Sequence, residues 1–155
     1  MQVSKFRIKF AQKLVYTTIL VSLIKLKFFK MAAEKILVTE DSSVIQNITR
    51  KVLEFQQYQV VLAKNGQEAL EELTKRDYDA VLLDITMPIM DGFKCIKAIR
   101  AMENEKKANI PVIAVTGNAK NYSAEEFKAM GFTEFIQKPL NFDSLVEVVN
   151  KVVRG

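Results

Sequence analysis

A-V-L-L-D-I-T-M-P-I-M-D-G, residues 80–92, is the stretch of the chain that decides the fold. Its first four residues are a continuous apolar run, the pattern of a strand buried on both faces of a parallel sheet. The run ends on a carboxylate, Asp84, and Pro88 rules out a central strand beyond it. Asp91 offers an N-cap for the helical pattern that begins at Gly92. Taken alone, Asp84 fits a ligand site at the carboxyl end of a strand, and it also fits a strand end that faces water.

From Met31 onward, strand patterns and helix patterns alternate five times. Such alternation predicts a parallel sheet with helices on both faces, and we expect the flavodoxin-like strand order 2-1-3-4-5. Ser123 and Glu126 form a capping box for a short helix that Gly131 ends. The expected strands lie at residues 35–38, 60–63, 80–83, 110–115 and 135–136.

The helix after the first expected strand has apolar residues at intervals of three and four, which is typical of a helix with one apolar face. Either Asp41 or Ser42 can cap it. The last helix has a similar apolar spacing. The apolar positions are Ile45, Ile48, Val52 and Phe55 in the first helix and Phe142, Leu145, Val146, Val149 and Val152 in the last.

The composition limits the chemistry that the chain can perform. With 155 residues there is room for one domain with a real hydrophobic core. The absence of histidine excludes Ser-His and Cys-His catalysis, imidazole-bound zinc and a phosphohistidine of the chain's own. The single cysteine, Cys95, excludes an internal disulfide and suits a reducing compartment, so we expect a cytoplasmic protein.

The net charge of +5 comes from the first thirty residues, which hold seven basic and no acidic residues. Residues 31–155 hold 16 basic and 18 acidic residues, a balance that predicts no attraction to nucleic acid. Leu14 to Ile24 is an uncharged run that is too short to span a bilayer. Three interpretations of residues 1–30 stay open: an upstream extension with Met31 as the true start, a segment that touches a membrane surface, or a segment that docks on another protein.

Polar residues end four of the five expected strands, and in the order 2-1-3-4-5 these four strands are neighbours. Three carboxylates in one pocket repel one another by roughly 4 kcal/mol per pair at about 4 Å and an effective dielectric constant near 20. A divalent cation relieves this repulsion, and oxygen ligands suit Mg²⁺. Together with a lysine, such a cation would hold the oxygens of a transferring phosphoryl group. The residues are Glu40, Asp41, Asp84, Thr116 and Lys138.

The chain closely resembles the receiver domains of two-component response regulators over about residues 34–153. The motifs that carry the resemblance are T-E-D-S at 39–42, D-I-T-M-P-I-M-D-G at 84–92, A-V-T-G at 114–117 and K-P at 138–139. The resemblance implies a receiver domain at residues 31–155. Because the sequence as given ends at Gly155, we expect a stand-alone receiver.

The resemblance also implies a role for each residue of the cluster. Asp84 would accept a phosphoryl group from a histidine kinase or a histidine phosphotransfer protein. Magnesium would be bound by Asp41, Asp84 and the backbone carbonyl of Thr86, with Glu40 acting largely through water. Thr116 and Phe135 would form the switch, Lys138 would bind the phosphoryl group, and the Lys138–Pro139 peptide bond would be cis.

The resemblance further implies where the signal leaves the domain and how long it lasts. A downstream protein would bind the surface formed by the 123–131 helix, the fifth strand and the 142–153 helix. Thr86 and Asn118 occupy the two positions that tune dephosphorylation in this family. Glu40 in place of the commoner aspartate and Gly117 in place of alanine are small departures from the family pattern.

Two other functions are compatible with parts of the pattern. A receiver that has lost phosphorylation would act only as a binding module, but the complete set of five residues argues against it. A phosphatase of the haloacid dehalogenase type also forms an aspartyl phosphate, but it needs a second aspartate two residues after the nucleophile, where this chain has Thr86. We therefore expect a domain that catalyses only its own phosphorylation and dephosphorylation, and no dedicated enzyme.

Overall fold

A computed structural model describes residues 15–23 and 33–155. The chain divides into two units, residues 1–33 and 34–155. Most of the predicted extension at residues 1–30 lies outside the described residues, so its three interpretations stay open. Residues 15–23 within it are helical. Among the described residues, no helix has both the length and the apolar character that crossing a membrane requires.

The second unit is a five-stranded parallel sheet in the order β2-β1-β3-β4-β5, which confirms the predicted fold class. Each strand is followed by a helix, and two further short helical turns lie in the connections. The strands are β1 (Lys35–Thr39), β2 (Gln59–Ala63), β3 (Ala80–Asp84), β4 (Val112–Thr116) and β5 (Glu134–Gln137). The helices are α2 (Ser43–Phe55), α3 (Gly66–Lys75), α4 (Gly92–Arg100), α5 (Glu105–Ala108), α6 (Ala124–Ala129) and α7 (Phe142–Arg154), with a 3₁₀ turn, η1, at Ala119–Asn121.

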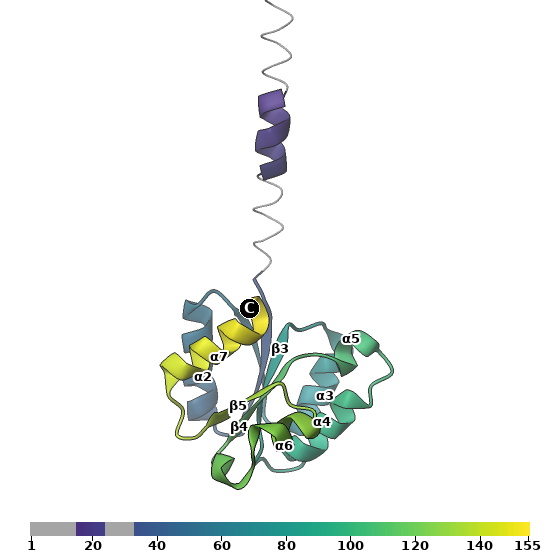
Figure 1. Cartoon of the computed structure of the whole chain (residues 1–155), viewed down its shortest axis with the longest axis vertical. Helices are drawn as coiled ribbons and strands as arrows, with labels where there is room; N and C mark the ends of the chain where they lie inside the picture. Colours follow the sequence, from purple (N-terminus) through teal and green to yellow (C-terminus); the bar gives the residue numbers. More distant parts are fainter. Residues whose placement is uncertain (1–14, 24–32) are drawn as a thin grey trace, which may run out of the picture. The chain divides into compact units, whose positions relative to one another are not determined.

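The sheet is covered on both faces, as Figure 1 shows. Helices α2 and α7 pack on one face, and α3, α4 and α6 pack on the other. Strand β3 shows why its apolar run is continuous, because successive residues enter opposite cores. Val81 and Leu83 lie in the core under α3 and α4, whereas Ala80 and Leu82 lie in the core under α2 and α7.

The helix starts follow the capping chemistry of the sequence. Asp91 accepts the Lys94 N–H at 2.8 Å, and Ser123 and Glu126 form the predicted capping box at the start of α6. Ser42, and not Asp41, is the N-cap of α2. The Asp41 carboxylate therefore has no capping role in this structure.

Strand β4 begins at Val112, two residues later than the sequence pattern predicts. Ile110 is instead held in a turn, where its N–H bonds the Lys107 carbonyl at 3.3 Å and its own carbonyl accepts Arg100 Nη1 at 2.8 Å. Pro111 has no N–H, and its carbonyl accepts the Val81 N–H at 2.9 Å. The prediction of a strand from residue 110 was wrong at its first two positions.

Only part of the apolar face expected on α2 packs on the sheet: Val52 packs against the core and Ile45 is half-buried, but the other two positions are exposed. The side chains that α2 buries are Gln46, Thr49 and Leu53, whereas Ile48 is 42% exposed and Phe55 is 85% exposed. Gln46 is tolerated in the interior because its amide donates to the carbonyls of Glu40 at 3.2 Å and Ala63 at 2.9 Å. Helix α2 therefore exposes an apolar surface.

Arg100 holds three chain segments together at the end of α4. Its guanidinium donates to the carbonyl of Ala108 at 2.7 Å and of Ile110 at 2.8 Å, and Nε and Nη2 donate to the Gly131 carbonyl at 2.9 and 2.6 Å. Gly131, the residue after the α6 C-cap, has φ +101°, a conformation that favours glycine. Arg100 thus supplies hydrogen-bond donors to these loop carbonyls.

Candidate functional site

The parallel strands bring the five predicted site residues to one edge of the sheet. Asp84 and Thr116 are the last residues of β3 and β4, Glu40 and Asp41 follow β1, and Lys138 follows β5. The Lys138 N–H donates to the Thr116 carbonyl at 2.8 Å, and the Lys138–Pro139 peptide bond is cis. The sequence therefore predicted the location of the cluster, while the role of each member stays a prediction.

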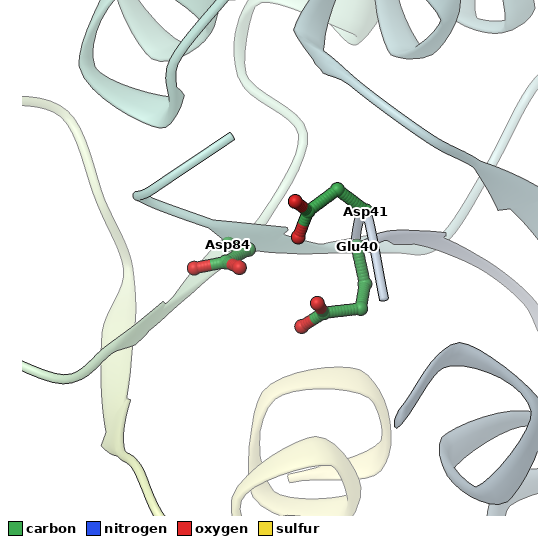
Figure 2. A group of neighbouring side chains, drawn as sticks. All are labelled: Glu40, Asp41 and Asp84. Carbon is green, nitrogen blue, oxygen red and sulfur yellow. The ribbon is translucent and has the colours of Figure 1, made fainter. Parts of the chain in front are cut away.

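The three carboxylates gather at this edge, as Figure 2 shows. Glu40, Asp41 and Asp84 each offer one carboxylate oxygen, and these oxygens all lie within 4.8 Å of one another. Asp84 is 3% exposed and Glu40 is 5% exposed, whereas Asp41 is exposed. Two buried carboxylates beside a third exposed one form a pocket with high negative charge and one open side.

Lys138 partly balances this charge. Its Nζ lies 2.6 Å from Asp84 Oδ2 and 3.0 Å from Glu40 Oε2. Burial lowers the pKa of the Lys138 ammonium, but the hydrogen bonds and charges of Asp84 and Glu40 outweigh burial and raise the pKa above its ordinary value. Lys138 therefore stays charged beside Asp84 at neutral pH.

Glu40 shows that one lysine does not fully compensate the pocket. Burial raises the pKa of the Glu40 carboxyl above its ordinary value, and repulsion by Asp84 adds to this effect. The Ser42 N–H, which donates to Oε1 at 3.0 Å, and Lys138 act in the opposite direction. An additional positive charge would thus relieve a real electrostatic cost.

The donor set at this edge fits a magnesium ion. It offers carboxylate oxygens from three residues, no nitrogen or sulfur ligand, and an open side for water, which is the coordination that Mg²⁺ prefers. Glu40, Asp41 and Asp84 are the residues that could hold the ion. Bound there, the ion would supply positive charge for the oxygens of a transferring phosphoryl group.

Backbone groups orient the Asp84 carboxylate from the opposite side. The Thr86 N–H donates to Asp84 Oδ1 at 3.1 Å, so Lys138 and Thr86 each hold one of the two carboxylate oxygens. Gly92 allows this loop to close tightly, since a Cβ at that position would lie 2.6 Å from the Asp84 carbonyl oxygen. The D-G pair at 91–92 therefore has a packing role as well as a capping role.

Gln46 belongs to the site, although the sequence did not reveal it. Its side-chain amide fixes the Glu40 carbonyl and ties the end of β1 to Ala63 at the end of β2. A polar residue one turn into α2 was the available signal, but hydropathy alone assigns such a residue to the solvent side. Gln46 positions the segment that carries Glu40 and Asp41.

The two predicted switch residues, Thr116 and Phe135, lie in different surroundings. Thr116 is buried, and its Oγ1 accepts the Asn118 N–H at 3.1 Å, so its hydroxyl proton can be donated to a neighbouring oxygen. Phe135 lies on β5 and stacks on Phe127 of α6, with 4.9 Å between ring centroids and 19° between ring planes. The ring of Phe135 thus contacts the helix that the sequence assigns to the output surface.

Comparisons with known proteins identify the family. A model of the response regulator receiver domain matches residues 36–150. Hybrid signal transduction histidine kinase I of Dictyostelium discoideum is 35% identical over 126 residues, which are 78% of this chain and 7% of the kinase. The chain belongs to the response regulator receiver domain family, and it spans only a small part of the curated relatives it matches.

Two solved structures share the fold. Chemotaxis response regulator CheY4 of Vibrio cholerae is 30% identical with a TM-score of 0.71, and the match covers 78% of this chain and 99% of that chain. The receiver domain of sensor histidine kinase PA1611 from Pseudomonas aeruginosa has the same identity and TM-score, and the match covers 80% and 100% of the two chains. In that structure a magnesium ion is coordinated in the active-site cleft. The chain is therefore a receiver domain of two-component phosphorelay signalling.

Proposed function

We propose that this domain accepts a phosphoryl group on Asp84 from a phosphohistidine of a histidine kinase or phosphotransfer protein. A carboxylate oxygen of Asp84 attacks phosphorus, the P–N bond to the imidazole breaks, and its electron pair leaves with the ring nitrogen. In this proposal, Lys138 and the Thr116 hydroxyl bind phosphoryl oxygens. The single cysteine and the absence of a disulfide fit action in the cytoplasm.

The observation that carries this proposal is the pairing at Asp84. A nucleophile must be held in a fixed orientation, and Asp84 is held by Lys138 Nζ at 2.6 Å and by the Thr86 N–H at 3.1 Å. The exposed Asp41 carboxylate lies at the same edge. A domain that served only as a binding module would have no need of this buried, electrostatically costly cluster.

Magnesium-dependent phosphorylation by a small donor tests the proposal. Phosphoramidate contains the P–N bond of a phosphohistidine and needs no cognate kinase. We expect intact-mass analysis to show one phosphoryl group per chain with Mg²⁺, and none with EDTA. Asp41→Ala should raise the Mg²⁺ concentration needed for half-maximal phosphorylation by about tenfold or more, because it removes one of three carboxylates. Equal phosphorylation with EDTA would contradict the proposal.

A groove beside Lys138 supports docking of a helical phosphodonor. It has a volume of about 490 Å³ and is lined by Ile45, Ile48, Lys138, Pro139, Leu140 and Phe142. Its apolar lining continues onto α2, where Val44 is 66% exposed. An amphipathic helix that carries the donor histidine would bury its apolar side chains here and bring the histidine toward Asp84. We propose this surface as the contact with the kinase or phosphotransfer protein.

Thr86 is expected to slow the loss of phosphate from Asp84. Thr86 and Asn118 are both exposed, whereas Asp84 is buried, so their side chains lie where water would approach. A β-branched threonine has no amide or carboxylate to hold the attacking water. Thr86→Asn should therefore speed hydrolysis of the purified phosphoprotein several-fold, measured by the decay of the phosphoryl mass. The matched variant Thr86→Val should not accelerate it, and a Thr86→Asn rate equal to wild type contradicts this role.

The output surface is proposed to be α6, β5 and α7. Phe135 on β5 stacks on Phe127 of α6, and Lys151 of α7 pairs with Glu134 of β5 at 2.6 Å, so these three elements are mechanically linked. A charge added at Asp84 would draw in the Thr116 hydroxyl and bias this region toward a second arrangement. Addition of beryllofluoride should shift amide resonances mainly in these elements. Shifts confined to α2 would contradict the proposal.

A further inference from the structure

Residues 15–23 form an exposed helix with an apolar face. Val15, Ile19 and Leu23 follow one another at intervals of four, with Tyr16 and Leu20 beside them, so these five side chains lie along one side of the helix. Their exposed fractions are 56%, 51%, 57%, 74% and 58% in that order. The other side carries Thr17, Thr18 and Ser22 together with Val21, which is 44% exposed, so the side with five apolar residues is the more apolar of the two. An apolar face of this size on a receiver-sized chain indicates a binding surface.

The charge of the surrounding sequence indicates what this face binds. Residues 1–30 contain seven basic residues and no acidic one, with Lys13 before the helix and Lys25 after it. Residues 31–155, in contrast, hold 16 basic and 18 acidic residues. The positive charge is therefore concentrated around the apolar helix. A second copy of the chain would bring like charges together, whereas an anionic surface would be attracted.

We infer that residues 15–23 dock on the surface of an anionic lipid bilayer. The five apolar side chains would enter the boundary between headgroups and acyl chains, and the positive charge of the surrounding sequence would be attracted to the lipid phosphates. Tyr16 suits this boundary, because its ring is apolar and its hydroxyl is polar. The uncharged run of eleven residues would reach only about 16 Å as a helix, far less than the roughly 30 Å of a bilayer core, so the segment would lie on the membrane.

This inference concerns a surface that phosphorylation at Asp84 does not require. It would place a receiver domain at the membrane face. Each basic residue near an anionic bilayer strengthens binding about fivefold, and the effect weakens as salt screens the charges. Burying one leucine side chain in the bilayer strengthens binding by a further factor of roughly ten. Both contributions can be removed separately by substitution.

Co-sedimentation of the full chain with lipid vesicles tests the inference. We expect binding to phosphatidylcholine vesicles that contain 30% phosphatidylglycerol, a decline as ionic strength rises, and little binding to phosphatidylcholine alone. Leu20→Asp should reduce binding by about tenfold or more. Lys13→Glu combined with Lys25→Glu should reduce it by at least about 25-fold, from two charges at about fivefold each.

Matched variants on the receiver domain provide the controls. Phe55→Asp likewise introduces a charge at an exposed apolar residue, and Lys94→Glu with Lys97→Glu reverses two exposed lysines; both variants should bind vesicles like wild type. Phosphorylation by phosphoramidate should be equal in all variants, which separates this test from the proposed function. The inference would be overturned if the chain bound neutral vesicles equally well, or if Leu20→Asp bound vesicles like wild type. It would also be overturned if the chain bound no vesicles but self-associated, and Leu20→Asp abolished that self-association.

Discussion

Asp84→Asn is expected to abolish phosphorylation by phosphoramidate completely, with no phosphoryl mass increment after prolonged incubation with Mg²⁺. The amide nitrogen is a poor nucleophile, and the substitution removes the negative charge that Lys138 contacts at 2.6 Å. The side chain keeps its shape, so the Thr86 N–H can still donate to the remaining carbonyl oxygen. The loss should therefore come from chemistry, with the fold retained.

Asp91→Asn is the matched control for this substitution. Asp91 lies seven residues further along the same segment, where its carboxylate caps α4 by accepting the Lys94 N–H. Asparagine is an equally good N-cap, so stability and phosphorylation should both resemble wild type. A full phosphoryl increment in Asp84→Asn, or its loss in Asp91→Asn, would contradict the assignment of Asp84.

Arg100→Met is expected to give a large loss of stability for a substitution outside the site. The guanidinium donates to the carbonyls of Ala108, Ile110 and Gly131, and methionine would fill its volume but leave all three without this donor. Hydrogen bonds from charged donors contribute roughly 1.5–3 kcal/mol each, and partial solvent access reduces the sum. We expect the free energy of unfolding to fall by about 3 kcal/mol and the melting temperature by on the order of 10 °C.

Lys97→Met on the same helix serves as the control for Arg100→Met. Lys97 is exposed, so its loss should change the free energy of unfolding by about 0.5 kcal/mol or less. Arg100→Lys should be intermediate, because one ammonium group cannot reproduce the planar fork of the guanidinium. Urea titrations of the three variants measure these differences. A wild-type unfolding midpoint in Arg100→Met would refute the role given to this residue.

Much of the fold could be predicted because its signals are local and repeated. The apolar run before Asp84 indicated a doubly buried strand, and alternating patterns predicted a parallel sheet. The carboxyl ends of parallel strands share one edge, so the residues that end β1, β3, β4 and β5 had to meet. The location of Glu40, Asp84 and Lys138 in one cluster followed from the expected flavodoxin-like strand order, in which the strands that precede them are neighbours.

What the sequence did not reveal depends on specific hydrogen bonds between side chains and backbone carbonyls. Gln46 is buried because its amide meets two carbonyls, and no local pattern shows that these carbonyls are there. As a result, Ile48 and Phe55 were assigned to an apolar face that the structure leaves exposed. Ile110 was likewise assigned to a strand, although Arg100 and Lys107 hold it in a turn. In each case a specific hydrogen bond, which hydropathy does not reveal, decided the local structure.

Chemical trapping of the phosphorylated residue tests the central claim most directly. Borohydride reduces an aspartyl phosphate to homoserine, which marks the residue permanently. Trypsin cleavage after Arg76 and Lys94 places four aspartates, Asp77, Asp79, Asp84 and Asp91, on one peptide and Asp41 on another. After treatment with phosphoramidate and Mg²⁺, fragmentation should show homoserine at position 84 and at no other position. Homoserine at Asp41 or at another aspartate of the 77–94 peptide would contradict the account.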